Sequence, residues 1–309
     1  MTDTPASMPA PSSSATAGPA PRGAGQGRFK GAGNYLALIP FHAYVGLFLI
    51  LPTLFVVVGA FSDGGGQFTL DNFRTMFTTD VFIESFVKSL QLAAITALLG
   101  AVFGSLLAWA VVRGDPQGLL RQLVIAASGV LAQFGGVMLA FAFLATFGFN
   151  GLITVIMKNS FGIRLDMSWL YSMTGLAIVY TYFQIPLMVI VFLPSLDGLR
   201  QEWYDASASL GGGAWSFWRN VGGPILAPSF LGALLLLFTN AFSAYATAQA
   251  LISQGCVLIT QQIACQMSSE VVLGQENVGK AMAFGMIVIV SGVMAVYALV
   301  QRRASRWVK

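Results

Sequence analysis

The stretch from Asp205 to Pro224, DASASLGGGAWSFWRNVGGP, lies between two long apolar segments that carry no charged residue. Its small and aromatic residues have helical spacing, which the glycines at 211–213 interrupt. A short polar stretch between two such apolar segments is where a membrane protein is expected to meet a soluble partner. The stretch therefore predicts a helix that ends at the glycines, followed by a turn at Gly222-Gly223-Pro224 that returns the chain into the membrane.

The composition of the whole chain indicates a protein of the lipid bilayer. Hydrophobic residues make up 56% of the sequence and charged residues only 9%, against about 25% charged residues in an average soluble domain. A membrane-spanning helix needs about 20 apolar residues. The sequence thus predicts an all-α integral membrane protein with six transmembrane helices, at 35–61, 90–112, 123–149, 170–193, 225–252 and 281–300, none of which contains Asp, Glu, Lys or Arg.

The distribution of basic residues predicts the orientation of these spans, because Lys and Arg near helix ends stay on the cytoplasmic side. With both termini in the cytoplasm, eleven basic residues lie inside and five lie outside, and the opposite orientation reverses that ratio. The formal charge of +4 therefore reports topology and indicates no nucleic-acid partner. The inner set is Arg22, Arg28, Lys30, Arg113, Arg121, Arg200, Arg219, Arg302, Arg303, Arg306 and Lys309, and the outer set is Arg74, Lys88, Lys158, Arg164 and Lys280.

The segments outside the spans have distinct compositions. Residues 1–30 are rich in Ala, Pro, Ser, Thr and Gly without an apolar run, which predicts a disordered cytoplasmic tail. The first apolar run is too long for a cleaved signal peptide and is expected to be a retained span. The predicted outer loop at 253–280 contains Cys256 and Cys265, the only cysteines. A disulfide between them is possible in an oxidising compartment, but sequence spacing leaves the pairing open.

The polar residues inside the predicted spans are few and uncharged. Such residues usually face a bundle interior or a cavity. Two explanations stay open for each of them, an interhelical hydrogen bond or a contact with a transported solute. We expect the second role, a substrate pathway, for Gln184, Asn240, Tyr245 and Gln249.

Neither a metal site nor a catalytic site is indicated by the sequence. His42 stands alone in its span, without a carboxylate or a second histidine nearby. The carboxylates lie outside the spans, and no nucleophile-elbow or zinc-protease pattern is present in the sequence. Gln184-Ile185-Pro186 predicts a kink in the fourth span, because proline lacks the backbone N–H that a helix requires. A kink of this kind can open a carbonyl toward a central cavity, as transporters often do.

The loop at 196–224 is unusual in its aromatic content. It carries Trp203, Tyr204, Trp215, Phe217 and Trp218, too many aromatic side chains to be left in water. Glu202 and Asp205 lie near the start of the predicted helix, whose free N–H groups favour negative charge. The loop is either an interfacial helix lying along the lipid headgroups or a docking helix for a cytoplasmic protein.

The spacing within this loop resembles the EAA motif of permease subunits of binding-protein-dependent ABC importers. That pattern is Glu-Ala-Ala, a Gly six residues after the Glu and a Pro thirteen residues after that Gly. Asp205, Ala206 and Ser207 take the first three places, and Gly211 and Pro224 stand at the expected intervals. The chain departs from the pattern at Asp205, at Ser207 and at the residue before the proline, where Gly replaces Leu.

This resemblance extends from about residue 35 to residue 306 and implies that 31–309 is a six-span permease domain with 196–224 as its coupling loop. Within the family the chain is most similar to permeases grouped with the spermidine/putrescine and ferric-iron importers, through YFQIPLMVIVFLPSLDGL from Tyr182. This similarity implies a small polar, polyamine-like substrate, although related permeases also carry aminoalkylphosphonates, thiamine or sugars. The coupling residues that the resemblance implies are Glu202, Asp205, Ala206, Ser207, Leu210, Gly211, Trp215, Trp218 and Pro224.

The resemblance also implies partners and a location. A solute-binding protein delivers substrate from outside, a second permease subunit, expected to be a different chain, completes the pathway, and an ATPase dimer binds below, in a bacterial cytoplasmic membrane. The sequence has no Gly-x-x-x-x-Gly-Lys-Ser/Thr loop, so ATP and Mg are expected on the ATPase and not on this chain. A secondary transporter or channel is the alternative, although ion-coupled carriers usually place ionisable residues in their spans. A membrane enzyme or assembly scaffold is a third.

Overall fold

The computed structural model describes residues 40–115, 117–163, 166–252, 255–268 and 276–304. The predicted tail at 1–30 lies outside the described residues. The chain divides into two compact units, residues 1–51 and residues 52–309. The described part of the first unit is helical and includes a π-helical turn, η1 (Gly46–Ile50).

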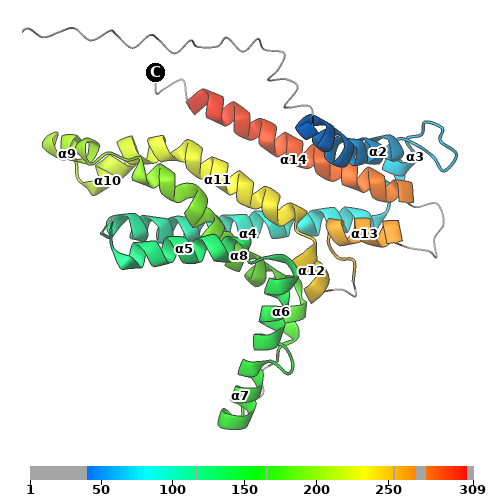
Figure 1. Cartoon of the computed structure of the whole chain (residues 1–309), viewed down its shortest axis with the longest axis horizontal. Coiled ribbons are helices and arrows are strands. Elements are labelled where there is room, and N and C mark those ends of the chain that lie inside the picture. Colours follow the sequence, from blue (N-terminus) through cyan, green and yellow to red (C-terminus); the bar gives the residue numbers. More distant parts are fainter. Residues whose placement is uncertain (1–39, 116, 164–165, 253–254, 269–275, 305–309) are drawn as a thin grey trace, which may run out of the picture. The chain divides into compact units, whose positions relative to one another are not determined.

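The second unit is built from helices, and no β-strand occurs in the part of it that the structure describes, apart from an isolated bridge between Ser62 and Phe68. Figure 1 shows the order of the helices along the chain. From residue 51 onward the described helices are α2 (Leu51–Ala60), α3 (Asp71–Thr78), α4 (Asp80–Arg113), α5 (Leu119–Gln133), α6 (Gly136–Phe147), α7 (Leu152–Phe161), η2 (Ser168–Tyr171), α8 (Met173–Asp197), α9 (Gln201–Ser209), α10 (Ala214–Phe217), η3 (Trp218–Gly222), α11 (Gly223–Ser243), α12 (Ala246–Leu251), α13 (Ile259–Ser268) and α14 (Glu276–Ala304).

The predicted fold class is confirmed. Among the residues that the structure describes, six helical segments are long and apolar enough to cross a membrane, and each overlaps one of the six predicted spans. They are Pro40–Ala60, Asp80–Arg113, Gly136–Phe161, Met173–Asp197, Ala214–Ser243 and Glu276–Leu299.

The third predicted span, 123–149, is not one helix. The chain leaves the helix at Phe134, and α6 starts again at Gly136, whose φ of +66° is in the left-handed region. Glycine adopts this conformation without the steric cost that other residues carry. The spanning segment therefore begins at Gly136 and continues through α7, while α5 is a shorter apolar helix before it.

The fifth predicted span, 225–252, is also broken, and it starts earlier than expected. α11 ends at Ser243, Ala244 is extended, and α12 begins at Ala246. The Tyr180 hydroxyl of α8 donates a hydrogen bond to the Ala244 carbonyl at 2.9 Å. This bond gives the Ala244 carbonyl a partner that the interrupted helix does not supply. A side chain distant in sequence therefore stabilises the break.

The predicted turn at 222–224 is wrong. The chain is helical from Ala214 to Ser243, with the π-helical turn η3 leading directly into α11 and Pro224 in the first turn of α11. Proline is tolerated in a first helical turn, because the N–H groups there have no intrahelical partner. The 214–224 part of the loop is consequently continuous with the helix of the fifth span.

The α4–α8 contact forms the centre of the second unit. α8 packs against α4 and α5, and α11 packs on both α4 and α8 (Figure 1). The face of α4 toward α8 is made of small residues, which let the two helix backbones approach closely. These residues include Ala93, Ala97, Gly100, Ala101, Gly104 and Ala108, all of them buried.

At Pro186, where the sequence predicts a kink, the chain stays helical. α8 is assigned as α-helix from Met173 to Asp197 with Pro186 buried inside it. Gln184 is fully buried, and its amide nitrogen donates to the Thr96 hydroxyl of α4 at 3.2 Å. The polar group of this segment thus binds the neighbouring helix.

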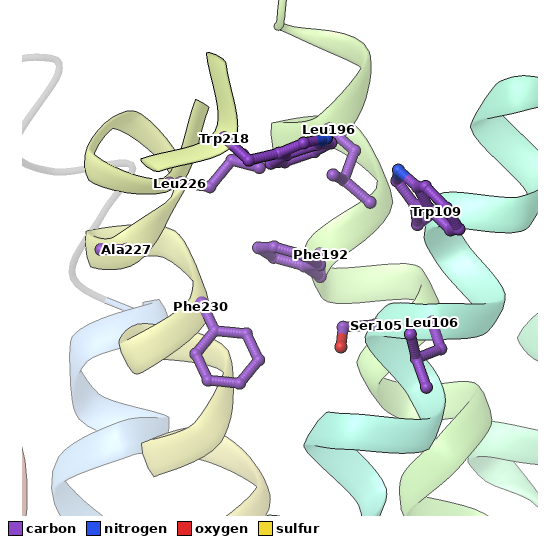
Figure 2. A pocket seen from close by; sticks show the side chains of 10 residues that line it. Ser105, Leu106, Trp109, Phe192, Leu196, Trp218, Leu226, Ala227 and Phe230 are labelled. Carbon is purple, nitrogen blue, oxygen red and sulfur yellow. The ribbon is translucent and has the colours of Figure 1, made fainter. Parts of the chain in front are cut away.

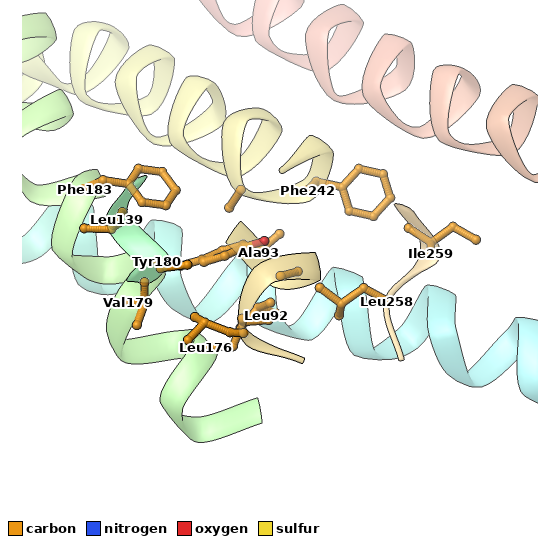
Figure 3. Close-up of a cluster of buried hydrophobic side chains, with 14 of the residues drawn as sticks. Leu92, Ala93, Leu139, Leu176, Val179, Tyr180, Phe183, Phe242, Leu258 and Ile259 are labelled. Atoms are coloured by element: carbon orange, nitrogen blue, oxygen red, sulfur yellow. The ribbon is translucent and has the colours of Figure 1, made fainter. Parts of the chain in front are cut away.

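A cluster of buried apolar side chains lies where the two broken helices meet α8. Tyr180 and Leu176 of α8 pack there with Leu139 of α6, Phe242 of α11 and Ile259 of α13 (Figure 3). These side chains come from helices far apart in sequence. The cluster therefore fixes the ends of both broken helices against α8.

We predict that Gly104→Ala lowers the unfolding temperature of the detergent-solubilised protein. An added Cβ would lie 2.7 Å from the Ile185 carbonyl oxygen, so the helices must separate, at about 1–3 kcal/mol for an overpacked core. Gly129→Ala in α5 is the control, because its Cβ meets nothing within 4 Å. Equal unfolding temperatures for the two variants would contradict the close-contact account.

Candidate functional site

The loop at 196–224, here called the motif segment, folds into two helices. α9 begins after Arg200, whose backbone is extended, and carries Glu202 in its first turn. One turn later the Asp205 carboxylate accepts a hydrogen bond of 3.3 Å from the Gln201 side-chain amide. A carboxylate near a helix N-terminus is stabilised by the free N–H groups there, so the acidic residues support the start of α9.

The three glycines end α9, as predicted. Gly211 has a φ of +81°, and its N–H donates to the Ala208 carbonyl at 2.9 Å. The Gly212 N–H donates to the Ser207 carbonyl, also at 2.9 Å. A left-handed glycine with bonds back to the last helical carbonyls is a common helix ending, and here it separates α9 from α10.

A groove of about 410 Å³ lies between α9 and the α10–η3 helix. It brings together Ala206, Ser207 and Leu210 of α9 and its C-terminal end, with Ser216 and Asn220 on the opposite side. Three of the predicted coupling residues therefore share one surface. Glu202 and Asp205 are exposed on the same helix but do not line this groove.

The aromatic residues of the motif segment divide into an inner and an outer set. Phe217 is buried, with the Tyr204 ring centroid 5.3 Å away and the Trp218 ring at 5.8 Å. Trp215 is 78% exposed and Leu210 is 90% exposed. Both residues present large apolar side chains to the surface, and we call Leu210 and Trp215 the outer apolar pair.

Trp218 and Pro224, the remaining predicted coupling residues, lie away from the outer apolar pair. Trp218 is half-buried and lines a different cavity, with side chains of α4 and α8. Pro224 is exposed in the first turn of α11. Both residues therefore lie where the motif segment meets the membrane spans.

An ion pair holds the start of the motif segment to α5. Arg121 donates to the Asp197 carboxylate at 2.6 Å, and the two side chains are 17% and 38% exposed. Asp197 is the last residue of α8. A half-buried pair is screened less than an exposed one, so it fixes the position at which the motif segment leaves α8.

The four predicted pathway residues have different surroundings. Gln184 is fully buried in the α4–α8 contact. Asn240 and Tyr245 are exposed near the end of α11 and at its break. Gln249 is half-buried in α12, and its carbonyl oxygen accepts from the Gln261 amide at 3.3 Å. The structure thus brings Asn240, Tyr245 and Gln249 to the region of the helix break and leaves Gln184 in the helix contact.

The two helix breaks lie side by side, which the sequence did not indicate. The Thr247 hydroxyl of α12 donates to the Gly136 carbonyl at the start of α6, at 3.1 Å. Gln261 of α13 is buried and donates to the Ile252 carbonyl at 2.7 Å. Threonine and glutamine next to apolar runs carry no distinctive signal, so only the fold identifies them as the residues that link the broken helices.

The two cysteines form a disulfide. Cys256 precedes α13 and Cys265 lies within it, with their Cα atoms 6.6 Å apart. The Ile259 N–H at the start of α13 donates to the Ser89 hydroxyl of α4 at 2.8 Å. The disulfide-bonded segment is therefore attached to the N-terminal half of α4.

Asp166, between α7 and α8, is the described loop residue with a shifted pKa. Its carboxylate accepts the Ser168 N–H at 2.9 Å, and this backbone bond, with a smaller contribution from the Ser168 side chain, lowers the Asp166 pKa below 3.8. The bond stabilises the loop above pH 3.8 and is lost as the pH falls through the lowered pKa. In the described residues no group of three or more His, Cys, Asp or Glu is placed to hold a metal ion.

Comparison with protein-family models gives no match. Among curated proteins, the chain is 25% identical over 199 residues to the probable sulfate transport system permease protein cysT of Nephroselmis olivacea, covering 64% of this chain and 68% of that protein. It is 25% identical over 204 residues to the sulfate transport system permease protein CysT of Escherichia coli strain K12, covering 65% and 69%. It is also 25% identical over 235 residues to the trehalose transport system permease protein SugB of Mycobacterium tuberculosis, covering 76% and 78%.

Solved structures share the fold at low sequence identity. A chain of a bacterial ABC transporter involved in import of the acidic polysaccharide alginate aligns with a TM-score of 0.68 at 16% identity, covering 90% of this chain and 97% of that one. A chain of the MetNI methionine ABC transporter in an inward-facing conformation aligns with a TM-score of 0.52 at 13% identity, covering 72% and 95%. The fold is that of ABC importer transmembrane domains.

These comparisons support the prediction of an ABC importer permease. They do not support the prediction of a particular subgroup within that family. The relatives named here are permease proteins of transport systems. The spermidine and ferric-iron subgroup is not supported, because the relatives named here are sulfate and trehalose permeases.

We predict that Gly211→Ala destabilises the end of α9, whereas Gly213→Ala does not. Alanine at a φ of +81° costs about 1–2 kcal/mol, whereas Gly213 has an ordinary φ of −80° and open space around it. Hydrogen exchange of the α9 amides should accelerate roughly tenfold in Gly211→Ala alone. Equal exchange in both variants would show that the left-handed glycine does not control the helix end.

Proposed function

We propose that this chain is the transmembrane permease subunit of an ATP-driven ABC importer, which forms the translocation pathway and couples to a separate ATPase through the motif segment. The observation that carries this proposal is the outer apolar pair on a helix ending that has the EAA spacing. Leu210 and Trp215 expose large apolar side chains, which a soluble partner can cover.

The coupling mechanism follows from the continuity of the helices. The helical run from Ala214 to Ser243 is roughly 45 Å long at 1.5 Å per residue, and it joins the motif segment to the break at Ala244. A displacement of the motif segment by a closing ATPase dimer moves this helix as a lever. The movement reaches Thr247 and Gly136, where the two broken helices are linked.

The proposed pathway lies along the broken helices, with Asn240, Tyr245 and Gln249 as the polar groups nearest the break and Gln184 deeper in the helix contact. These side chains are uncharged. A polyamine would require carboxylates to offset its positive charges in the membrane. We therefore propose a small polar solute, neutral or anionic, which agrees with the sulfate and sugar names of the relatives.

The partners of this permease would be an ABC ATPase dimer, a solute-binding protein and a second permease subunit. ATP and Mg would bind on the ATPase, because this sequence lacks a phosphate-binding loop of its own. The sulfate permeases CysT and CysW are two different relatives of this chain, which supports a different chain as the second permease. A secondary transporter remains the alternative function, and it would need no ATPase.

The proposed orientation places both termini and the motif segment in the cytoplasm of a bacterial cell. Ser89, which bonds the disulfide-bonded segment, and Trp109, which lines a cavity with Trp218, are 20 residues apart on α4. This separation is about 30 Å of helix, the thickness of the hydrocarbon core. The disulfide and the motif segment therefore belong to opposite sides, and a disulfide belongs to the oxidising side.

We predict that a membrane-impermeant maleimide labels the chain in intact cells only after reduction with an impermeant phosphine. Cys256 and Cys265 are the only cysteines, so the wild-type chain reports on this loop alone. The Cys256→Ser, Cys265→Ser variant carrying a new cysteine at exposed Ser209 is the control and should label only after lysis. Labelling of Ser209→Cys in intact cells would contradict the proposed orientation and place the motif segment outside the cell.

We predict that Leu210→Asp weakens ATPase association by about thirtyfold, the loss of roughly 2 kcal/mol expected for a buried interface anchor. The unfolding temperature should not change, because Leu210 is 90% exposed. Phe161→Ala at the end of α7, an apolar residue 67% exposed on the other side, is the control. Unaltered capture of the ATPase by Leu210→Asp, measured by quantitative pull-down, would exclude the outer apolar pair as the contact.

A further inference from the structure

We propose that the chain carries a binding site for an anionic phospholipid where α4, α8 and α11 meet the motif segment. The site has two parts, an apolar slot for an acyl chain and an adjoining basic cavity for the headgroup. Its assignment to the cytoplasmic leaflet rests on the proposed function. The binding chemistry of the site does not depend on the proposed function.

The apolar slot has a volume of about 510 Å³. Trp109 of α4, Phe192 of α8, and Trp218 and Phe230 of η3 and α11 form its walls, and Ser105 is the one hydroxyl residue in its lining (Figure 2). The slot opens at the surface of the helices, because Leu106 and Ala227 are exposed there. Apolar surface of this extent at the edge of a membrane domain matches a hydrocarbon chain.

The basic cavity, of about 400 Å³, continues from the slot and shares Trp109, Leu196 and Trp218 with it. Arg113 and Arg200 line it, and both are exposed. The Arg113 guanidinium carbon lies 4.0 Å from the centre of the Trp109 ring. This cation–π contact holds the charge at the mouth of the slot.

The charge of this cavity is not neutralised by its own lining. No Asp or Glu is among the described residues that line either cavity. Asp197, at the end of α8, is engaged by Arg121 at 2.6 Å. The two arginines therefore leave a net positive site that an anion can occupy.

The two indole rings lie at the boundary between the parts. In Figure 2 the nitrogens of Trp218 and Trp109 are on the sides that face the gap between the two rings, beyond Phe192 and Phe230. Tryptophan at a membrane interface places its ring in the apolar layer and its N–H toward the headgroups. A basic pocket between membrane helices on the cytoplasmic side suits an anionic lipid headgroup, whereas a free anion would leave the slot unfilled.

The test is native mass spectrometry of the full-length chain in a non-ionic detergent, titrated with dioleoylphosphatidylglycerol. Arg113→Ala with Arg200→Ala should weaken binding roughly twenty-five-fold, from about fivefold for each basic residue near the surface. Arg74→Ala with Lys158→Ala, which removes the same charge from exposed residues of other helices, is the matched control and should bind as the wild type does. Ala227→Trp, which fills the open slot from an exposed position, should weaken binding about tenfold, as for roughly two excluded methylene groups.

Three outcomes would overturn the proposal. Equal affinity for dioleoylphosphatidylcholine would show that the headgroup charge is not recognised. Full competition by glycerol 1-phosphate would show a site for a free anion and not for a lipid. Unchanged lipid binding with lost ATPase capture in the double arginine variant would make the cavity a protein interface. The lipid measurement requires no ATPase, so it stands or fails independently of the importer assignment.

Discussion

The close approach of α4 and α8 is the contact on which the rest of the fold depends. Gly100 and Gly104 present no side chain, and a Cβ at either position would lie 2.5 Å from the Cβ of Gln184 or Met188 of α8. In a bilayer, helix association gains little from hydrophobic burial and depends on close packing and interhelical hydrogen bonds. The Gln184–Thr96 bond at 3.2 Å lies in the same contact, so packing and polar pairing fix one register of the two helices.

That register places the motif segment and the helix breaks at opposite ends of α8. At one end, α8 leads into the motif segment, and the Arg121–Asp197 pair fixes its start. At the other end, Tyr180 holds the broken end of α11 through the Ala244 carbonyl. In the proposed importer, the rigid part transmits movement and the broken part yields to it, because regular helices are stiff and the breaks have fewer backbone bonds.

The sequence predicted the features that depend on composition and local conformation. The six spans follow from long apolar runs, and the end of α9 at 211–213 follows from glycine. The break before Gly136 was not predicted, because a Gly-Gly pair within an apolar run also fits close helix packing. The break at Ala244 has no local signal, because it depends on a hydroxyl 64 residues away in the chain. The turn expected at 222–224 was wrong, since Gly-Gly-Pro also fits the beginning of a helix.

For the candidate site, the sequence identified the motif segment but not the division of its aromatic residues. Phe217 and Trp215 are two positions apart in the same short helix, and only packing makes one buried and the other 78% exposed. The polar residues of the spans were similarly indistinguishable until the fold placed Gln184 in a helix contact and Tyr245 at a break.

The most direct test of the central claim is purification of the tagged chain from its native membrane in mild detergent, with identification of the co-purified proteins by mass spectrometry and an assay of ATP hydrolysis. A permease of an ABC importer should bring with it an ATPase, a second permease subunit and a solute-binding protein, with measurable hydrolysis of ATP. Recovery of the chain alone under several gentle conditions, with no ATPase and no hydrolysis, would contradict the account and favour a self-sufficient carrier or channel.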